Sequence, residues 1–553
     1  MREKRKTHLF VLLLILLVAL AGGITFVINK YVPSKQQMDL NLYYGGLSQG
    51  EAALVLETEI LEERGLHEGE TWYLPLSVVN SRLNQRYFWD EKESQILYAT
   101  PSELVRVPAE AAGGGSVYLK NGTVFLSLPF VQQFTDVDLV TGMGPDRIAM
   151  RNDFSEKQVV TVEKGTALRY ESGIKSDVLI YVAPGDVLLL MEDLEGWYKA
   201  ASRDGFIGYV QKKAVSAPAI QSQDRPQVRE EYSHFTREDP VVLVWHNMDI
   251  NYPEGNGYLT DYTRNMSGVN VISPTWMRLH EDNSGNLISI VSSDYVEKAH
   301  QMGLQVWGLV DNFGACSTLS IISSTDTRQR LVQNLIAEAL SCGMDGINVD
   351  FESLSEEAGN YFLEFLRELS IETHKNHLVL SVDNPVPQSY TSHYDRKEQG
   401  EVVDYVIIMG YDEHGNWEPQ NPGSLASLPW VEQGIVDTIA EAPAERVINA
   451  IPFYTAVWMM SGSMGMENVS MARQNEMVKE YKAEIYWDKT VSQNVATYER
   501  DGQDYKIWME DNASIAEKVK LVPKYDLAGL ACWRLGQEDN SIWQTIAENL
   551  RRG

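Results

Sequence analysis

Short apolar runs alternate with longer amphipathic stretches over residues 239–553. Short apolar runs bounded by turn residues are typical of buried strands, and a spacing near 3.6 residues is typical of helices. Eight runs have the character of strands: Val241–Trp245, Val269–Ser273, Gln305–Val310, Gly346–Glu352, Leu378–Val382, Tyr405–Met409, Arg446–Pro452 and Gly529–Leu535. Eight strands joined by helical crossovers predict an α/β fold, a (β/α)8 TIM barrel.

The most clearly patterned helix lies between the third and fourth runs. Ser324 or Thr325 can cap its start, and Gly343 ends it. Its expected apolar face holds Val332, Leu335, Ile336, Ala339 and Leu340. Between the seventh and eighth strands, three further runs predict a small α+β insertion: Glu484–Trp487, Val495–Tyr498 and Tyr505–Met509.

Residues 40–155 contain an internal repeat of a strand, a short helix and a hairpin. The first copy covers Tyr73–Val79, Tyr87–Asp90 and Gln95–Tyr98, and the second covers Val124–Phe130, Val137–Val140 and Arg147–Met150. This segment resembles the small α+β module at the N-terminus of copper amine oxidases. It has no cluster of His or Cys ligands for copper, so we expect a spacer or a wall-binding module.

Residues 157–216 alternate like a small β-barrel, with turns at Pro184-Gly185, Glu195-Gly196 and Asp204-Gly205. The strings from Gly196 and Asp204 resemble bacterial Src-homology-3-like domains, which often bind cell-wall peptides. An unrelated five-stranded barrel is the alternative. Residues 217–238 are polar and lack an apolar period, which predicts a linker before the catalytic barrel of residues 239–553.

Residues 1–30 are expected to form a basic cytoplasmic segment and a membrane anchor. Basic residues crowd positions 2–6, and an uncharged run from Leu9 to Ile28 has the length of about 20 residues that a bilayer requires. The positive-inside bias then places the rest of the chain outside the cytoplasm, as a single-pass protein. Cleavage of a signal peptide near Ala19-Leu20-Ala21 is the alternative, and it also implies export.

Composition narrows the possible partners. The 553 residues carry 47 basic and 77 acidic side chains, a net charge of -30 that repels phosphate backbones and argues against nucleic acid as a partner. The three cysteines, Cys316, Cys342 and Cys532, are widely spaced, so neither a disulfide framework nor a cysteine zinc site is expected. No other residue set has metal-ligand spacing, and we expect neither metal nor cofactor.

The chemistry is concentrated in the fourth strand, which ends Asn348-Val-Asp350-Phe-Glu352. Because side chains alternate along a strand, these three polar residues share one face, and the apolar residues between them take the other. In a barrel the polar face points inward, at the carboxyl end where such barrels place their active sites. Neighbouring carboxylates disfavour a second charge, so one pKa should rise, as a general acid requires. Solvated acids at the rim are the alternative interpretation.

The longer string from Asp345 to Glu352 resembles the D-x-x-D-x-D-x-E signature of glycoside hydrolase family 18. Asn348 replaces the usual second Asp, as it often does in spore-cortex and cell-wall members. Other segments resemble family motifs in the same order: Met409-Gly-Tyr411-Asp412 closing strand six, Ala450 to Tyr454 closing strand seven, and Ala531-Cys-Trp533 in strand eight.

This resemblance implies a retaining mechanism without a carboxylate nucleophile. Glu352 would protonate the glycosidic oxygen, and the N-acetyl oxygen of the substrate would attack the anomeric carbon. Asp350 would orient the acetamido N–H, and Tyr411 would hold the acetyl oxygen. The resemblance further implies a substrate-binding site that includes Asp345, Asn348, Met409, Asp412, Tyr454 and Trp533.

Aromatic rings suit the apolar faces of sugars. Five tryptophans near strand ends are therefore candidate subsite walls or, equally, barrel packing residues: Trp245, Trp276, Trp307, Trp430 and Trp458. The pairs Asp311-Asn312 and Asp383-Asn384 are candidates for binding sugar hydroxyls or, equally, for solvated residues at the rim. His246 and His414 are expected to have positioning or structural roles.

The leading functional hypothesis is a peptidoglycan-directed β-N-acetylglucosaminidase with wall-binding accessory modules. A chitinase or chitooligosaccharidase is the alternative enzyme, and a catalytically inactive glycan-binding wall protein is the alternative outside enzymes. The presence of Glu352 argues for activity, because inactive relatives usually lose this glutamate.

Overall fold

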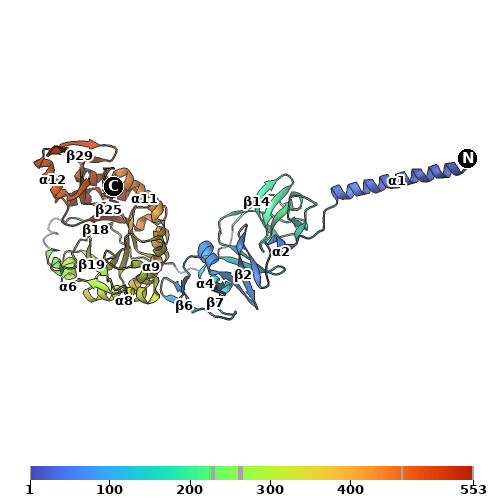
Figure 1. Ribbon diagram of the computed structural model, residues 1–553, viewed down its shortest axis with the longest axis horizontal. Coiled ribbons are helices and arrows are strands. Elements are labelled where there is room, and N and C mark those ends of the chain that lie inside the picture. The colour runs from blue at the N-terminus through green and yellow to red at the C-terminus, as the bar shows by residue number, and fades with distance from the viewer. Residues whose placement is uncertain (1, 223–224, 226–230, 260–265, 462–464, 551–553) are drawn as a thin grey trace. The chain divides into compact units, whose positions relative to one another are not determined.

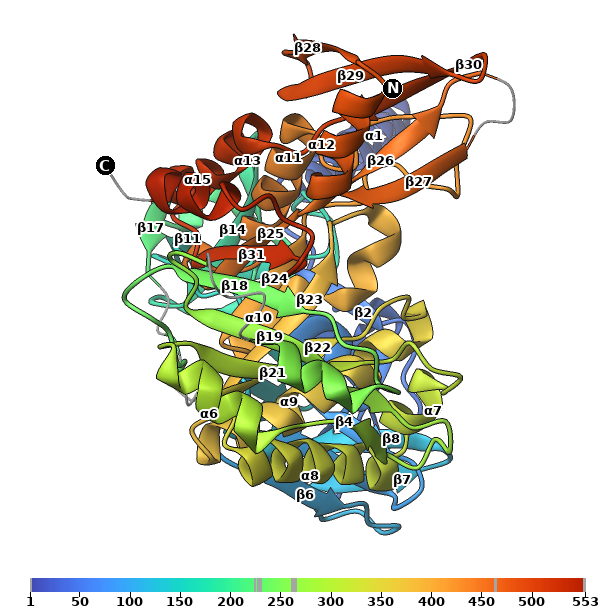
Figure 2. The ribbon, with the colours of Figure 1, turned by 90° about the vertical axis from the view of Figure 1, so that its left-hand side faces the viewer.

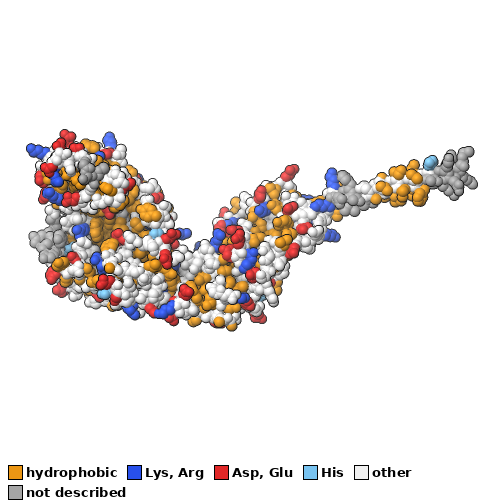
Figure 3. Space-filling model, in the orientation of Figure 1, with side chains coloured by type: hydrophobic (Ala, Val, Ile, Leu, Met, Phe, Trp, Pro, Cys, Tyr) orange, Lys and Arg blue, Asp and Glu red, His pale blue; other side chains and the backbone are white. Residues whose placement is uncertain are grey.

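The computed structural model describes residues 2–222, 225, 231–259, 266–461 and 465–550. The chain divides into two compact units (Figure 1), the first holding described residues of Met1–Leu97 and Arg106–Arg229 and the second those of Tyr98–Val105 and Glu230–Gly553. Acidic side chains are spread over the visible face of both units rather than gathered into one patch (Figure 3). The charge of the chain therefore forms no single acidic site on this face.

The second unit is built around eight parallel strands that close into a barrel (Figures 1 and 2). In order around the barrel they are β18 (Val241–His246), β19 (Val271–Leu279), β21 (Gln305–Asp311), β22 (Gly346–Asp350), β23 (Val379–Pro385), β24 (Tyr405–Met409), β25 (Val447–Pro452) and β31 (Gly529–Trp533). Closure occurs where β18 pairs with both β19 and β31. The predicted (β/α)8 barrel is confirmed. A short strand, β20 (Leu287–Ser289), adds to the edge of β19.

Helices surround the barrel: α6 (Ser293–Gln301), α7 (Thr318–Ser323), α8 (Thr325–Cys342), α9 (Gly359–Lys375), α10 (Arg396–Val402), α11 (Leu428–Ile439), α13 (Asn512–Val519), α14 (Leu521–Lys524) and α15 (Ile542–Asn549). Helix α8 is the helix predicted between the third and fourth strands, and Gly343 ends it with a φ of 76°. Its buried face is rotated from the expected one, because Leu331 and Cys342 are buried whereas Leu340 is 52% exposed.

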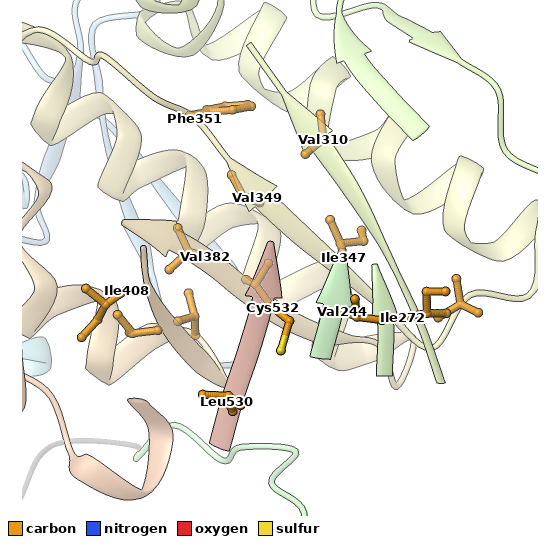
Figure 4. Close-up of a cluster of buried hydrophobic side chains, with 14 of the residues drawn as sticks. Val244, Ile272, Val310, Ile347, Val349, Phe351, Val382, Ile408, Leu530 and Cys532 are labelled. Carbon is orange, nitrogen blue, oxygen red and sulfur yellow. The ribbon is translucent and has the colours of Figure 1, made fainter. Parts of the chain in front are cut away.

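Apolar side chains on the outer face of the strands pack beneath these helices. Figure 4 shows Ile347 and Val349 of β22 in one cluster with Phe351, the residue after β22. Val310 of β21 and Val382 of β23 belong to the same cluster. The strict alternation leaves Asn348 and Asp350 on the opposite, inner face. The core of the barrel therefore fixes which side chains of β22 reach the interior.

The insertion between β25 and β31 is larger than predicted. It forms a five-stranded antiparallel sheet in the order β27-β26-β30-β29-β28, together with helix α12 (Met471–Glu480) (Figure 2). Its strands are β26 (Tyr454–Met459), β27 (Gly465–Ser470), β28 (Glu484–Asp488), β29 (Gln493–Arg500) and β30 (Gln503–Trp508). Strands β26 and β27 were not predicted, because the apolar run of β26 follows that of β25 almost without a break.

The first unit is rich in strands. Each predicted repeat copy contains the expected strand, short helix and hairpin elements: β3 (Thr71–Pro75), α3 (Leu76–Val78), β4 (Phe88–Asp90) and β5 (Gln95–Ala99), then β8 (Thr123–Ser127), α4 (Leu128–Phe134), β9 (Asp138–Gly142) and β10 (Arg147–Arg151). One sheet has the order β7-β8-β3-β2-β1-β10-β9, where β1 is Glu51–Leu56, β2 is Glu59–Glu68 and β7 is Val117–Lys120. Strand β6 (Leu104–Pro108) continues the sheet of β4 and β5. The two family resemblances of this region stay predictions.

A second sheet of the first unit has the order β13-β12-β16-β15-β14-β11-β17. Its strands are β11 (Lys157–Thr161), β12 (Thr166–Arg169), β13 (Val178–Val182), β14 (Val187–Leu194), β15 (Trp197–Ala201), β16 (Ile207–Gln211) and β17 (Ala219–Gln221). Strand β17 pairs with β11, so the predicted linker of residues 217–238 begins with a strand. Its residues 223–224 and 226–230 lie outside the described residues.

The end of the predicted linker is attached to the barrel. The Phe235 N–H donates to the Asp404 carboxylate at 2.7 Å, and the Arg237 N–H donates to the Tyr405 hydroxyl at 2.9 Å. Asp404 immediately precedes β24, so these bonds lie at the amino end of the barrel, opposite the expected site. Residues 231–238 thus belong to the catalytic unit in this structure.

The predicted anchor lies on helix α1 (Arg2–Tyr31). Part of the expected span, including the side chains of residues 24–26, lies outside the described residues. Within the part of the chain that is described, no helix has both the length and the apolarity needed to cross a membrane.

A buried ion pair links the insertion to the barrel. The Lys518 ammonium on α13 contacts both oxygens of Glu510 at 2.9 Å, and the two side chains are 0% and 1% exposed. Gln493 and Ser514 donate to the same carboxylate. Removing the cation alone would leave a buried, uncompensated charge.

We therefore expect Lys518→Met to lower the free energy of unfolding by roughly 3–5 kcal/mol. The double variant Lys518→Met/Glu510→Gln should recover much of this loss, because no isolated charge remains. Urea unfolding of both variants, read against wild type, measures the effect. A single variant as stable as wild type would show that this pair does not contribute to stability.

Candidate active site

The candidate acid lies at the carboxyl end of the barrel. Strand β22 ends at Asp350, and Glu352 follows two residues later, close enough for its charge to act on Asp350. Asp350 is buried, whereas Glu352 is partly exposed. The predicted inward face of the fourth strand therefore carries both carboxyl groups to the end of the barrel where active sites form.

Burial is the main reason that both carboxyl groups hold protons more tightly than usual. The pKa of Glu352 is raised first by burial and then by the charges of Asp412 and Asp311. The pKa of Asp350 is raised well above its ordinary value by burial, followed by the charges of Asp383 and Glu352. The sequence predicted a raised pKa from the neighbouring carboxylate, but removal from water is the larger cause.

Asp350 also presents an unsatisfied acceptor. Its Oδ1 atom is buried and has no hydrogen-bond partner among the described residues. A buried carboxyl oxygen without a donor is energetically costly. A ligand that brings an N–H or O–H group to this position would remove that cost.

Asn348 is held in one orientation beneath this pair. The Trp245 indole N–H donates to Asn348 Oδ1 at 2.9 Å, and the Ser273 hydroxyl donates to the same oxygen at 3.2 Å. Since an indole N–H can only donate, the amide nitrogen must point the other way, where it donates to Asp383 at 2.9 Å. Asn348 therefore organises the barrel interior and donates to Asp383 rather than to Asp350.

The backbone of Glu352 is fixed by Asn312, which follows β21. Asn312 Oδ1 accepts from the Glu352 N–H at 3.0 Å, and its Nδ2 donates to the Glu352 carbonyl at 2.9 Å. Nδ2 also donates to the Thr318 hydroxyl at 3.0 Å. Asn312 was expected to bind sugar hydroxyls, but in this structure it positions the candidate acid.

Asp311, its neighbour, forms a two-point ion pair with Arg278 at 2.6 and 3.0 Å. Asn384 donates to Gln399 at 2.7 Å. Together with the Asp383–Asn348 bond, these contacts engage the side chains of both predicted hydroxyl-binding pairs within the protein. Arg278 was missed because β19 extends beyond its predicted end at Ser273. The one sequence feature that could have indicated its role is a single arginine near the end of an apolar strand.

Tyr411 and Asp412 follow β24 on the other side of Glu352. Gly410 allows the chain to pass β25 here, because a Cβ atom at this position would lie 2.7 Å from the Ala450 carbonyl oxygen. The Tyr454 hydroxyl donates to Asp412, and the rings of Tyr454 and Tyr411 meet edge to face at 6.2 Å. Burial raises the pKa of Tyr411 well above its ordinary value, so its hydroxyl stays a donor at neutral pH.

Two further predicted residues reach this region. Met409, the last residue of β24, is half-buried. Trp533 ends β31 and is also half-buried, with its ring 5.8 Å from that of Trp245. Tyr454 begins β26 rather than closing β25, so the insertion contributes directly to the site.

Asp345 lies at the opposite end of the barrel. It precedes β22 and is five residue steps from Asp350, a distance of roughly 16 Å along the strand. Its carboxylate accepts from the Val306 N–H at 2.7 Å and lies 2.8 Å from His300 Nε2. The expected role in substrate binding is therefore wrong for this structure, in which Asp345 ties β22 to its neighbours.

The tryptophans expected as subsite walls are mostly in the core. Trp245 and Trp276 are 1% and 0% exposed, and Trp276 donates to Asn256 at 2.7 Å. A ring without exposed surface cannot stack on a sugar, so both pack the barrel instead. Trp307 and Trp458 are buried as well, and Trp430 is half-buried. Among the described residues that follow barrel strands, the aromatic side chains that are at least half exposed are Tyr252, Phe313, Tyr390 and Trp417.

The two histidines singled out in the sequence contact other residues than Asp350 and Glu352. His246 Nδ1 lies 2.8 Å from the buried Tyr295 hydroxyl, and His414 Nδ1 lies 2.8 Å from the Ser424 carbonyl oxygen. Burial lowers the pKa of His246 to about 4. No group of three His, Cys, Asp or Glu residues with metal-binding geometry occurs among the described residues.

Comparison with known proteins finds similarities over the barrel. Residues 308–538 match the family model for glycosyl hydrolases family 18. The uncharacterized glycosylase YvbX of Bacillus subtilis is 24% identical over 284 residues, which cover 49% of this chain and 82% of that protein. The cortical fragment-lytic enzyme of Bacillus anthracis is 23% identical over 247 residues, 43% of this chain and 57% of that enzyme. This chain thus spans little more than half the length of that relative.

A chitinase from Chromobacterium violaceum has the same fold, with a TM-score of 0.50 at 24% identity. The alignment covers 56% of this chain and 99% of the chitinase chain. The matched residues contain β22, which ends at Asp350, and β31, which ends at Trp533. They also contain β24, which Tyr411 follows, and β25. Most of the barrel, residues 308–538, is therefore similar to glycosyl hydrolases family 18 in sequence, and the barrel has the fold of a chitinase.

Proposed function

We propose that this chain is an exported hydrolase that cleaves β-1,4 bonds of peptidoglycan next to N-acetylglucosamine. The observation that carries the proposal is the pair of inward-facing carboxyl groups at the end of β22. Glu352 holds its proton more tightly than an ordinary glutamic acid, and Asp350 presents a buried oxygen without a donor. A general acid next to a free hydrogen-bond acceptor suits a sugar that carries an acetamido group, whose N–H can donate to the acceptor.

In the proposed reaction, the Glu352 carboxylic acid protonates the glycosidic oxygen as the bond to the anomeric carbon breaks. The acetamido oxygen of the same sugar attacks that carbon and forms an oxazolinium ring, so the enzyme supplies no nucleophile. Glu352, now a carboxylate, then removes a proton from water, which opens the ring. The raised pKa of Glu352 suits both steps near neutral pH.

Asp350 and Tyr411 support the attacking group. The acetamido N–H would donate to Asp350 Oδ1, which otherwise lacks a partner among the described residues. The Tyr411 hydroxyl, which stays protonated, would donate to the acetyl oxygen. Trp533 and Tyr454 are half-buried or buried rings beside them and are suited to border the sugar.

Peptidoglycan is favoured over chitin by the relatives and by the sequence. One relative is named for the lysis of cortical fragments, which supports a wall polymer as substrate. Export is supported by the N-terminal sequence, in which basic residues precede an uncharged run. The side chains from Phe10 to Val18 on α1 are exposed, so the protein itself does not bury this apolar stretch.

Wall attachment through residues 40–216 completes the proposal. The first unit contains a cavity of about 540 Å³ lined by side chains of both charges, among them Arg151, Lys157, Asp138 and Glu57. A mixed lining of this kind suits a peptide with both ammonium and carboxylate groups.

The first test removes the proton donor. Glu352→Gln should lower kcat by about 10²- to 10⁴-fold, because the amide cannot protonate the leaving oxygen. Sugar binding should persist, since the shape of the side chain is kept. Release of reducing ends by the purified protein measures the rate. Glu499→Gln, the same change at an exposed position on β29 of the insertion, serves as the control and should leave the rate unchanged. An active Glu352→Gln variant would disprove the assignment.

The pH profile provides a second test. Protonated Glu352 is the active form for bond cleavage, so a raised pKa extends activity toward higher pH. Asp412 contributes to that rise through its negative charge. Asp412→Asn should therefore move the alkaline limb of kcat/KM to lower pH. Asp437→Asn, the same charge change on the outer helix α11, should leave the limb in place. A shift to higher pH would contradict the assigned role of Asp412.

Substrate choice is the third test. The protein should release products faster from peptidoglycan glycan strands than from chitin oligomers of the same length. Mass spectrometry of the sugars released from both substrates identifies the bond that is cut. Faster turnover of chitin oligomers would instead support the alternative of a chitinase.

A further inference from the structure

A second cavity opens directly beside the candidate acid. It has a volume of about 470 Å³, within the range of small-molecule sites. Two segments form its walls: residues 312–319, which follow β21 and enter α7, and residues 352–358, which follow β22. Glu352 itself is part of the lining, so whatever occupies the cavity lies next to the carboxyl group.

The lining is polar but largely uncharged. Hydroxyl and amide groups come from Asn312, Ser317, Thr318, Ser353 and Ser355, and apolar surface comes from Phe313, Leu319, Leu354 and Ala358. Apart from Glu352, Cys316 is the titratable residue of this described lining, and burial raises the pKa of its thiol. A neutral group that can form hydrogen bonds fits such a lining, whereas a carboxylate would be repelled by the negative charge of ionised Glu352.

The cavity and the sugar-binding residues lie on different sides of Glu352. Strand β22 lies between β21 and β23 in the barrel. The cavity is on the side of β21, whereas Tyr411, Tyr454 and Trp533 come from β24, β26 and β31 beyond β23. If those residues surround the sugar that is attacked, the cavity adjoins the sugar that leaves.

The chemistry of a 1,4-linked glycan determines which atoms reach this cavity. Glu352 protonates the oxygen attached to carbon 4 of the leaving sugar. The substituent on carbon 3 is therefore on the adjacent carbon. In chitin that substituent is a hydroxyl, which leaves most of a 470 Å³ cavity empty. In muramic acid of peptidoglycan it is a lactyl ether whose carboxyl group is joined to a peptide.

We propose that this cavity is a specificity site that receives the amide-linked lactyl group on carbon 3 of the leaving sugar. The inference rests on the proposed function and deepens it. The hydroxyl and amide groups of the lining pair with the lactyl amide, and the rings and aliphatic side chains cover its methyl group. Phe313, half exposed at the cavity, becomes covered when the group is bound.

Asn312 couples this cavity to the acid. The same side-chain amide bonds Thr318 on the cavity wall and both backbone groups of Glu352. An occupant that fixes the wall therefore also fixes the position of Glu352. Substrates with the lactyl amide should gain in kcat as well as in binding.

The test fills the cavity and compares two substrates. Ser355 lines the cavity and is exposed, and its hydroxyl has no hydrogen bond to another described residue, so Ser355→Phe fills space without breaking such a bond. The substrates are a muramyl-peptide oligosaccharide and an unsubstituted N-acetylglucosamine oligomer of the same length. We expect Ser355→Phe to reduce the ratio of their kcat/KM values by about tenfold or more. Ser389→Phe, an exposed position after β23 outside the cavity, should leave the ratio unchanged.

Chemical modification gives a second measurement on the native fold. Of the three cysteines, all described, Cys316 alone is not buried. A small neutral methanethiosulfonate should attach there and lower the same ratio, and Cys316→Ala should be insensitive to the reagent. Equal losses on both substrates, in the variant and after modification, would overturn the inference and leave the proposed function intact. A wild-type protein that cleaves neither substrate would overturn both.

Discussion

Two carboxyl groups on the inner wall of a closed barrel cannot both be charged at low energetic cost. Strand alternation places Asp350 and Glu352 on that wall, because Phe351 between them packs in the apolar core beneath the helices. Burial then raises the pKa of each group more than their mutual repulsion does. The property needed for acid catalysis thus follows from the same alternation that builds the core.

The polar groups around this pair have distinct positions and roles. Asn348, fixed by Trp245, donates to Asp383 and keeps the barrel interior paired. Asn312 holds the backbone of Glu352 from the side of β21. The insertion sheet begins at Tyr454, whose hydroxyl donates to Asp412 on the other side. Glu352 therefore lies between Tyr454 and Asp412, on the side proposed to hold the attacked sugar, and the cavity proposed to receive the leaving sugar.

The sequence predicted the barrel well because its strands are buried on both faces and appear as continuous apolar runs. The signature on β22 points to a candidate acid for the same reason, since its polar residues interrupt such a run at alternate positions. Local pattern could not give contacts made across the barrel. Asp345 matched the signature but lies at the wrong end of the strand, bonded to Val306. Trp245 looked like a sugar platform, yet its exposure depends on neighbouring strands. The role of Asn312 depends on a bond to a residue 40 positions away.

The stereochemistry of the first product tests the central claim most directly. Several carboxyl groups besides Asp350 surround Glu352, among them Asp311 and Asp412, and a base among them that activated water would invert the anomeric carbon. Attack by the acetamido group of the substrate, with Asp350 as its support, retains the configuration. Proton NMR during the first turnovers distinguishes the two anomers before they equilibrate. Our account predicts the β-anomer as the initial product, and an initial α-anomer would contradict it.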